Sequence, residues 1–395
     1  MANYRVSRYL LSTYEFLGSG ETERVASHVL TSISTGQHLE VGLDDLDLLR
    51  RLCGEGWVSE QFLEDQQVTP ERLNRWVRLG ILLSDAEEDY ATLPRVREGL
   101  LEAGHWPPFA AVFHLMNHHQ ESRLVPFGKV FETALGEEQA LERAASFLEL
   151  HGTPPPAFVA RQDRLAVHEL PMEIHGSDFT EILLRRRTCR RFAPDEALKL
   201  ADLSSLLRGV FGAWAERGLS NELRLLLKTS PSGGSLHPVE AYPILFCCEK
   251  VACGVYHYQA ETHSLELLRE MSEADLRRLC VFLAEGQSFV GSCAALFVLV
   301  ARFDRNFWKY RERENSYAVV LQDAGHLSQT FQLMATDLGL GAFYTAAINS
   351  EAISDILGLP YPAEAPLGIL GVGRAAEEAS GGVPARPFNP QDQRR

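Results

Sequence analysis

The stretch RRRTCRRF, residues 185–192, places five arginines within eight residues of a chain whose formal net charge is −15. Like charges at this spacing repel one another unless an anion lies among them, so the stretch predicts a phosphate-binding segment. The guanidinium groups of Arg186, Arg187 and Arg190 and the hydroxyl of Thr188 can donate to a single terminal phosphate. A solvated basic turn is the alternative, and this stretch taken alone leaves both open.

A second polar stretch, SPSGGSLHP at residues 230–238, precedes an apolar run that begins near Tyr242. Because Gly233 and Gly234 carry no side chains, the backbone of this turn can lie directly against a flat ligand. The stretch lacks the Gly-Lys-Ser/Thr of a Walker loop and the spacing of GxGxxG, so neither a nucleotide triphosphatase nor a dinucleotide-binding domain is indicated. A plain glycine-rich turn is the alternative.

The composition excludes several classes of protein. With 395 residues, 45% of them hydrophobic and 23% charged, the chain is long enough for two globular domains. No apolar run approaches the roughly 20 residues that span a bilayer, and the N-terminus lacks a secretory signal, so we expect a cytoplasmic protein without membrane attachment. The acidic balance argues against nucleic-acid binding, because phosphate backbones favour basic surfaces.

Metal binding is not expected. The seven cysteines contain no CxxC pair, and several lie in apolar surroundings typical of buried free thiols. Cys247, Cys248 and Cys253 have poor spacing for zinc because they lie along one predicted strand and hairpin. The histidines at 114, 118 and 119 have helical spacing, but no carboxylate or cysteine joins them in a recognised pattern, so they are interpreted as packing or interface residues.

The order of segments predicts three regions. Residues 1–95 begin with alternating segments at 4–17 and 26–41, followed by helices at 43–56, 59–67 and 69–82, which favours a small winged-helix-like domain. Ser59 and Thr69 are the expected N-caps of the last two helices, with Pro70 in the first helical position. Residues 96–165 form a helical connector that ends in the proline-rich linker HGTPPPAF, residues 151–158.

The third region, residues 166–395, alternates helices and strands. The predicted helices are at 179–185, 197–211 and 316–338, and the predicted buried strands are at 241–249 and 293–303. An α+β sandwich with helices around a central sheet is the simplest assembly. The tail after Ala376, rich in Gly, Pro, Gln and Arg, is expected to be an extended arm.

Motifs along this third region resemble the nitroreductase-like flavoproteins, and within them the SagB-type dehydrogenases, which oxidise azoline rings in ribosomally made peptides. RRTCRRF resembles their RRSxRxF phosphate-binding segment, PSGGSLHP their PSAGALYP loop, and GVYHYQAETHSLELL, residues 254–268, their GLYHYDPxxHxLExL hairpin. WKY at 308–310, DAGHLSQTFQLMATDLGLGAF at 323–343 and PLGILGVGR at 366–374 follow in the family's order. The combination is far more specific than any single motif.

The resemblance implies FMN as cofactor and a homodimer, because FMN sites in these flavoproteins generally lie at the subunit interface. It implies roles for the following residues: Arg186, Arg187, Thr188 and Arg190 near the phosphate and ribityl chain, Ser232, Gly233 and Gly234 against the flavin, Gly339, Leu340 and Gly341 on its far side, and Arg374 as a further candidate for the phosphate end.

Lys309 and Tyr310 match the Lys-Tyr pair to which SagB-type enzymes assign proton abstraction. Desaturating a carbon–heteroatom ring requires a hydride acceptor and a base for the neighbouring carbon, and either side chain can be that base if its surroundings lower its pKa. Lys309 can alternatively hold Tyr310 or a carboxylate by charge. Without the resemblance, this pair would be interpreted as a surface feature.

Three positions depart from the family pattern. The tyrosine of the family's loop is His237 here, the Asn that follows Gln329 is Thr330, and the Arg often found before the long helix is replaced around Tyr317 and Ala318. Flavin contacts made through backbone can survive all three changes. The departures therefore bear on the surface that faces the peptide.

The N-terminal region resembles the PqqD-like leader-peptide recognition module, in which an edge strand, here near residues 24–41, would pair with a precursor's leader. A small structural or dimerisation domain is the alternative, and a DNA-binding winged helix is less favoured because residues 70–80 are only mildly basic.

The sequence thus predicts an FMN-dependent dehydrogenase that oxidises an azoline to an azole in a precursor peptide, with oxygen as the natural final electron acceptor and a cyclodehydratase as a candidate partner. Two rivals stay open. One is a nitroreductase-type enzyme that passes electrons from NAD(P)H to a small molecule. The other is a catalytically inactive scaffold whose N-terminal module delivers a leader peptide.

Overall fold

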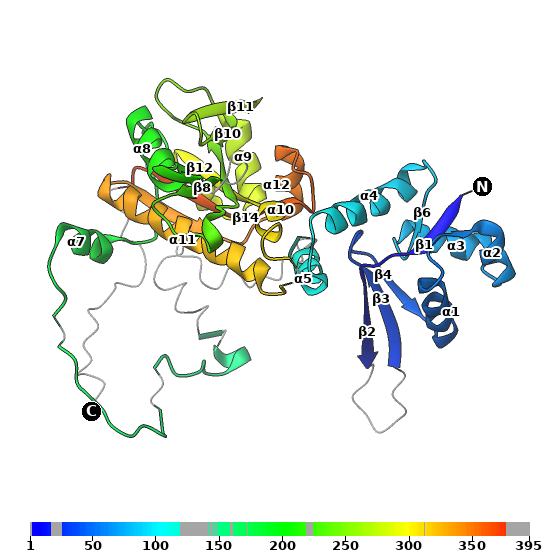
Figure 1. Cartoon of the computed structure of the whole chain (residues 1–395). Helices are drawn as coiled ribbons and strands as arrows, with labels where there is room; N and C mark the ends of the chain where they lie inside the picture. The colour runs from blue at the N-terminus through cyan, green and yellow to red at the C-terminus, as the bar shows by residue number, and fades with distance from the viewer. Residues whose placement is uncertain are drawn as a thin grey trace.

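A computed structural model describes residues 2–16, 26–118, 142, 145–146, 148–158, 161–171, 173–218, 224–311 and 313–376. The N-terminal unit lies at one end of the molecule and a larger helix-covered sheet at the other, with helices α4 (Asp89–Ala103) and α5 (Pro108–His118) between them (Figure 1). Within these described residues, no helix is both long enough and apolar enough to cross a bilayer. His119 and the tail after Ala376 lie outside them, and so does most of the predicted helical connector after His118.

The N-terminal unit contains two small antiparallel sheets and three short helices. Its sheets have the strand orders β5-β1-β6 and β2-β3-β4. The strands are β1 Asn3–Val6, β2 Leu10–Phe16, β3 Ala26–Ser32, β4 His38–Val41, β5 Val58–Ser59 and β6 Leu82–Ser84, and the helices are α1 Leu43–Cys53, α2 Glu60–Asp65 and α3 Pro70–Arg78. The strand-then-helix order predicted from the sequence is confirmed, although the short strand β5 intervenes between α1 and α2.

Local capping explains where these helices begin. The Ser59 hydroxyl accepts from the Phe62 backbone N–H at 3.3 Å, and the Thr69 hydroxyl accepts from that of Arg72 at 3.3 Å. Each hydroxyl thereby satisfies one backbone donor that the first turn of a helix leaves unpaired. Both N-caps and the first helical position of Pro70 agree with the sequence prediction.

The C-terminal domain is built on a six-stranded antiparallel sheet with the order β11-β10-β9-β12-β14-β13. Its strands are β9 Val239–Leu245, β10 Gly254–Gln259, β11 Ser264–Glu270, β12 Ala295–Arg302, β13 Gly341–Thr345 and β14 Glu364–Gly373, and β7 Ala215–Gly218 pairs with β8 Arg224–Leu227 in a separate hairpin. The helical segments are α7 Asp178–Arg185, α8 Leu200–Phe211, η2 Gly233–Ser235, α9 Glu273–Leu283, η3 Ser288–Ser292, α10 Phe303–Phe307, α11 Ser316–Asp337 and α12 Ser350–Leu357.

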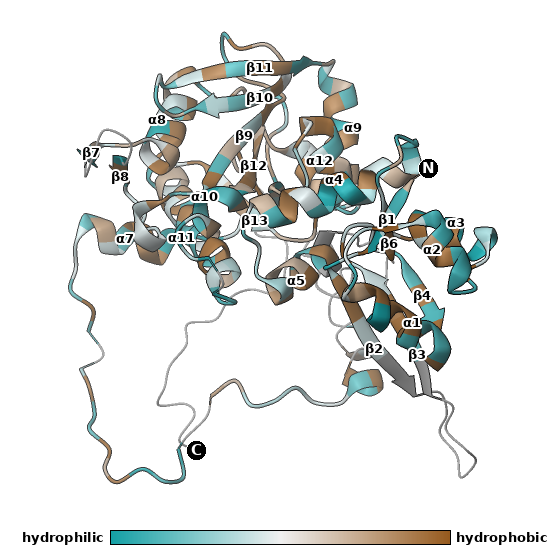
Figure 2. Ribbon diagram, turned by 45° about the vertical axis from the view of Figure 1, so that its right-hand side comes forward, coloured by the Kyte–Doolittle hydropathy of each residue, from teal (hydrophilic) through white to brown (hydrophobic). Residues whose placement is uncertain are grey.

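Strand β12 shows why this sheet is covered on both faces. Its alternate residues Phe297 and Leu299 pack into one core with α8 and α11, whereas Leu296 and Val298 pack into a second core with α9 and α12. Successive side chains of a strand point to opposite faces, so an uninterrupted apolar strand requires cover on both. The α+β sandwich predicted from the sequence is confirmed (Figure 2).

The connecting helices are anchored to this domain by aromatic packing. Trp106 lies with its ring centre 4.8 Å from those of Phe303 and of Phe307. His114 is buried, and its Nδ1 lies 3.0 Å from the Tyr317 hydroxyl at the start of α11. Helix α4 runs from the N-terminal core, where Ala91 packs, to the C-terminal one, where Leu101 packs. The predicted domain boundaries near residues 95 and 165 stay predictions.

The proline-rich linker at residues 151–158 is exposed throughout, as its composition predicts, and it is drawn in Figure 1 as an extended segment leading toward α7.

Candidate functional site

The arginine stretch leaves helix α7 and joins the edge of the main sheet. Ser177 caps the start of α7, and the helix ends at Arg185. The backbone of Thr188 then forms a parallel bridge with Ala342 in β13, and the Cys189 N–H donates to the Ala342 carbonyl at 2.8 Å. Arg186 reaches across to the long helix, where its Nη1 lies 3.4 Å from Oε1 of Gln332. The stretch is therefore held beside the C-terminal part of α11.

The glycines that follow α11 belong to the same neighbourhood. Gly339 has a φ of +70°, which allows the chain to leave α11 and enter β13 after the half-buried Leu340. A Cβ atom on Gly341 would lie 2.6 Å from Sγ of Cys189, so only glycine permits this close approach to the arginine stretch. These three glycine-loop residues thus lie beside the predicted phosphate-binding arginines.

Arg374 is brought to the same edge by the last strand. Phe192 and Ala375 form an antiparallel bridge, and the Ala193 N–H donates to the Arg374 carbonyl at 2.9 Å. The Arg374 side chain is more than half exposed and lies 3.8 Å from a carboxylate oxygen of Glu196. Arg190 is half-buried nearby, with its guanidinium carbon 5.7 Å from the centre of the Phe289 ring.

The glycine-rich turn is held at the other half of α11. Asp323 is buried on that helix, and its carboxylate accepts from the Ser232 hydroxyl at 2.5 Å and from the Gly233 N–H at 3.3 Å. Burial raises the pKa of Asp323, although these two hydrogen bonds oppose the rise. The Ser232 hydroxyl also accepts from the His237 N–H at 2.9 Å, which closes the turn on itself.

Lys309 and Tyr310 lie directly against this turn. Gly234 has a φ of +65°, and a Cβ atom placed there would collide with Nζ of Lys309 and lie 2.9 Å from the Tyr310 hydroxyl oxygen. The Lys309 ammonium is 5.5 Å from the centre of the Tyr310 ring. Lys309 is exposed and Tyr310 is half-buried. Bare backbone, a hydroxyl and an amine therefore converge at one place.

Within one copy of the chain, the predicted residues form two groups. Asp323 holds the glycine-rich turn, and Gln332 contacts Arg186. These two residues lie about 14 Å apart along α11, because the helix rises by about 1.5 Å per residue. The arginines, Gly339–Gly341 and Arg374 form one group at the sheet edge. Ser232, Gly233, Gly234, Lys309 and Tyr310 form the other.

Sequence reasoning assigned no role to Asp323, although it is the first residue of the DAGH motif. A carboxylate within an amphipathic helix is a sequence signal for a functional or structural contact, because a buried acid requires hydrogen-bond partners. Its two partners in the glycine-rich turn are nearly a hundred residues away in sequence, and only the fold brings them together.

The departures from the family motif have defined contacts. Thr330 Oγ1 lies 2.7 Å from the Ser230 hydroxyl, just before the glycine-rich turn. Tyr317 is buried in the aromatic cluster of α5 and α10, with its ring stacked on that of Phe303 at 5.0 Å between centres. His237 has a φ of +47°, and its Nε2 donates to the Leu226 carbonyl at 2.9 Å.

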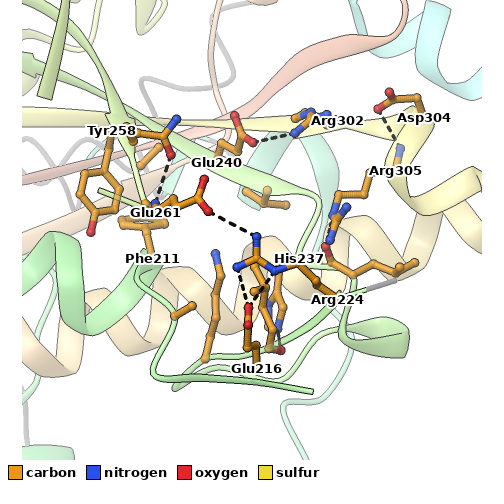
Figure 3. A pocket seen from close by; sticks show the side chains of 18 of the residues that line it. Phe211, Glu216, Arg224, His237, Glu240, Tyr258, Glu261, Arg302, Asp304 and Arg305 are labelled. Atoms are coloured by element: carbon orange, nitrogen blue, oxygen red, sulfur yellow. Dashed lines mark hydrogen bonds and ion pairs between the residues drawn. The ribbon is translucent and has the colours of Figure 1, made fainter. Parts of the chain in front are cut away.

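A large cavity adjoins the glycine-rich turn on the side away from the arginine stretch. It encloses about 1060 Å³ and is lined by residues that include His237 from the turn, Trp308 beside Lys309, and Lys228 after β8. Figure 3 shows ion pairs on its walls, among them Arg224 with Glu216 and Arg302 with Glu240. No sequence motif indicates this cavity, because its walls come from separate segments between Ala103 and Trp308.

His237 should make the stability of the protein depend on pH. Burial, together with the charge of Lys228, lowers the pKa of His237 to about 4 from an ordinary 6.5. The folded state therefore binds fewer protons than the unfolded state between these values, so stability is lost as the pH falls from 6.5 toward 4. We expect His237→Asn, which suits a positive φ, to show a smaller fall in Tm between pH 7 and pH 4.5.

Thermal unfolding followed by circular dichroism at a series of pH values tests this. The exposed His175 supplies a matched control, His175→Asn, which should retain the wild-type slope. Equal slopes for the wild type and His237→Asn would show that His237 does not titrate in this way.

Comparisons with known proteins show the family of this chain. A model of the nitroreductase family matches residues 183–374. The chain is 33% identical over 211 residues to MJ1384 of Methanocaldococcus jannaschii, named as a candidate nitroreductase, and the match covers 52% of this chain and 98% of that protein. It is 31% identical over 142 residues to the trifolitoxin-processing protein TfxB of Rhizobium leguminosarum bv. trifolii, covering 34% of this chain and 36% of TfxB.

Solved structures with a similar fold include a nitroreductase-like protein from Ralstonia eutropha JMP134, with 26% identity, a TM-score of 0.41, and coverage of 57% of this chain and 96% of that one. The Escherichia coli microcin synthetase McbBCD complex, solved with truncated pro-MccB17 bound, contains a chain with 20% identity and a TM-score of 0.49, and the match covers 70% of this chain and 98% of that one.

Proposed function

The chain belongs to the nitroreductase family and is related to the trifolitoxin-processing protein, and from this premise we propose that it is an FMN-dependent, SagB-type dehydrogenase. Its substrate is an azoline ring in a ribosomally synthesised precursor peptide, which it oxidises to the aromatic azole. The observation that carries the proposal is the convergence of Lys309 and Tyr310 on the bare backbone of Gly234.

The residues fit a flavin nucleotide at both ends. Arg186 donates to the side-chain oxygen of Gln332, and Arg187 donates to the backbone carbonyls of Leu184 and Arg186. Within the described part of the chain, no carboxylate pairs with either arginine. Two such guanidinium groups beside a threonine hydroxyl suit a phosphate. At the other end, Gly233 and Gly234 offer backbone that a flat ring can approach.

The proposed roles of the chain's residues follow from their positions. FMN, when bound, supplies the acceptor for the hydride that leaves one ring carbon. Tyr310, acting as its phenolate, would take the proton that leaves the neighbouring carbon and become the neutral phenol, with the Lys309 side chain beside it. Asp323 holds the glycine-rich turn in place through Ser232 and Gly233. Loss of one hydride and one proton leaves the ring with the additional double bond.

Arg186, Arg187, Thr188, Arg190 and Arg374 are proposed to hold the phosphate end of FMN, and Gly339, Leu340 and Gly341 its far side. Since these residues and the glycine-rich turn form two separate groups along α11, a complete site would be made from two copies of the chain. We therefore propose a homodimer with FMN at the subunit interface.

The N-terminal unit is proposed to recognise the precursor's leader as a winged-helix-like, PqqD-like module. In the three-stranded sheet of order β2-β3-β4, strands β2 and β4 are at the two edges, where an added peptide strand can pair. A cyclodehydratase that forms the azoline would supply the substrate.

The similarity to MJ1384 across nearly all of that protein favours a second candidate, an NAD(P)H-dependent oxidoreductase acting on a small molecule. Rapid bleaching of the flavin by NADPH in the absence of peptide would favour it over the dehydrogenase.

The visible absorbance spectrum of the purified full-length protein tests the shared premise of both candidates. We expect the spectrum of an oxidised flavin and the release of about one FMN per chain on denaturation. A colourless protein that takes up no added FMN would contradict both and would favour a scaffold that delivers a leader peptide. Released FAD would contradict the assignment of FMN.

A further inference from the structure

The large cavity beside the glycine-rich turn has a position suited to substrate. His237 lines it from the turn, and Trp308 lines it immediately before Lys309. Lys228 and His237 also line a smaller cavity that reaches Ser232 and Asp323. At about 1060 Å³, the large cavity lies just above the range of about 300–1000 Å³ for small-ligand pockets, which leaves room for several peptide residues.

Most charged groups on the cavity wall are already paired. Arg224 bonds Glu216 at 2.5 Å and lies 3.3 Å from Glu261. Arg302 lies 3.1 Å from Glu240. Figure 3 shows these ion pairs of both arginines. An anion entering the cavity would therefore find no unpaired positive charge at Arg224 or Arg302.

Three cations on the wall, Lys228, Arg305 and Arg208, have no carboxylate partner within the part of the chain that the structure describes, and the guanidinium carbon of the exposed Arg208 lies 5.3 Å from the centre of the Trp214 ring. Lys228 makes no hydrogen bond or ion pair there, and Nε of Arg305 donates to the backbone carbonyl of Leu236. The nearby carboxylate of Asp304 accepts from the Arg305 backbone N–H at 2.7 Å, an interaction drawn in Figure 3. A positive region therefore remains between the glycine-rich turn and Trp308.

Burial makes the charge of Lys228 costly. Burial, opposed by the charge of Glu240 and aided by that of Arg305, lowers the pKa of Lys228 to about 8. A half-buried ammonium without a partner is stabilised by any anion that can reach it, since the Coulomb attraction is stronger away from bulk water. The fold thus keeps a cation where an apolar side chain would be cheaper to bury.

We propose that the large cavity is the binding site for the peptide substrate and that Lys228 and Arg305 bind a carboxylate of that peptide, directing the neighbouring residues toward Lys309 and Tyr310. This inference rests on the proposed function for the identity of the ligand. The carboxylate is either an Asp or Glu side chain or the peptide's own C-terminus. Lys228 and Arg305 are positioning residues, because they bind the peptide at a carboxylate and do not contact the ring that reacts.

Peptide binding can be measured without turnover. The probe is a fluorescein-labelled Gly-Ser peptide that ends in two aspartates, and its anisotropy is followed with full-length protein at low ionic strength, with and without added FMN. Three counterparts carry a C-terminal amide, asparagines in place of the aspartates, or both changes. We expect the acidic peptide to bind at least about tenfold more tightly than the counterpart that carries both changes, as charged hydrogen bonds predict. The two single changes identify which carboxylate is bound.

Lys228→Met should weaken binding of the acidic peptide about tenfold or more and leave the neutral counterpart unaffected. The exposed Lys199, which lies outside the cavity lining, supplies the matched control, Lys199→Met, which should bind like the wild type. Arg305→Gln is a second variant whose loss of affinity does not depend on how Lys228→Met folds.

Equal affinity of the acidic and neutral peptides, or equal losses in Lys228→Met and Lys199→Met, would overturn the proposal. Its failure is separable from that of the proposed function. Binding of the acidic peptide by a protein that does not oxidise azolines would leave the carboxylate site standing, and azoline oxidation that is unaffected by Lys228→Met and Arg305→Gln would remove the site alone.

Discussion

Replacing Tyr310 by Phe should lower turnover of an azoline-containing peptide by at least about 100-fold and leave the content of bound FMN unchanged. The change removes one hydroxyl, the group that a Cβ on Gly234 would meet at 2.9 Å, and retains the ring beneath the Lys309 ammonium. A general base typically contributes about 10²–10⁴-fold to a reaction rate. The decrease should therefore appear in kcat, with little change in KM.

Single-turnover reduction of the flavin by the peptide, followed by loss of visible absorbance without oxygen, measures this step directly. Tyr90→Phe is a matched control, because Tyr90 is exposed near the start of α4 and far in sequence from the site. Unchanged turnover in Tyr310→Phe would remove the proposed role of Tyr310. Lys309→Met should also slow reduction, and a change in its KM alone would instead assign Lys309 to substrate binding.

The double variant Arg186→Gln/Arg187→Gln should weaken FMN binding by about 10²–10⁴-fold. Each hydrogen bond between a charged donor and a phosphate contributes roughly 1.5–3 kcal/mol, and glutamine retains hydrogen-bonding capacity but not the charge. Since each 1.4 kcal/mol is a factor of ten, losing two such bonds gives this range. Quenching of FMN fluorescence on titration into protein stripped of flavin gives the dissociation constant.

The chain offers a matched control for this change. Arg50 and Arg51 are adjacent, exposed arginines in the last turn of α1, so Arg50→Gln/Arg51→Gln removes the same charge from the N-terminal unit. That variant should bind FMN like the wild type. If both double variants lose affinity equally, the effect is one of net charge, and the arginines of residues 185–192 have no specific role in holding the phosphate.

The sequence was informative where the determining interactions are local. Helices α2 and α3 begin at Ser59 and Thr69 as predicted, because a capping hydroxyl bonds a backbone N–H three residues along the chain. Strand β12 could be recognised from its uninterrupted apolar residues, and a glycine with positive φ follows the end of α11. The order of the motifs also led to the correct family.

Other features depend on contacts between distant segments. The pairing of Asp323 with Ser232 and the position of Lys309 against Gly234 join residues that are between 75 and 91 positions apart, from 234 to 309 and from 232 to 323. Neither periodicity nor a local motif predicts a contact between residues so far apart in the sequence. The arginines and the glycine-rich turn both resemble motifs of a single cofactor site. Their separation along α11 could not be predicted from that resemblance.

The residue types alone thus predicted a phosphate-binding role for the arginine-rich segment. They also indicated a glycine-rich turn, a sheet covered on both faces and its helices, because capping, periodicity and composition act over a few residues. Folding established which of these meet. It placed Lys228 and Arg305 without carboxylate partners in the described part of the chain, on the wall of a cavity where Arg224 and Arg302 are paired. Whether a charge is buried or paired depends on the residues that lie next to it in space, and these neighbours are determined only when the chain folds.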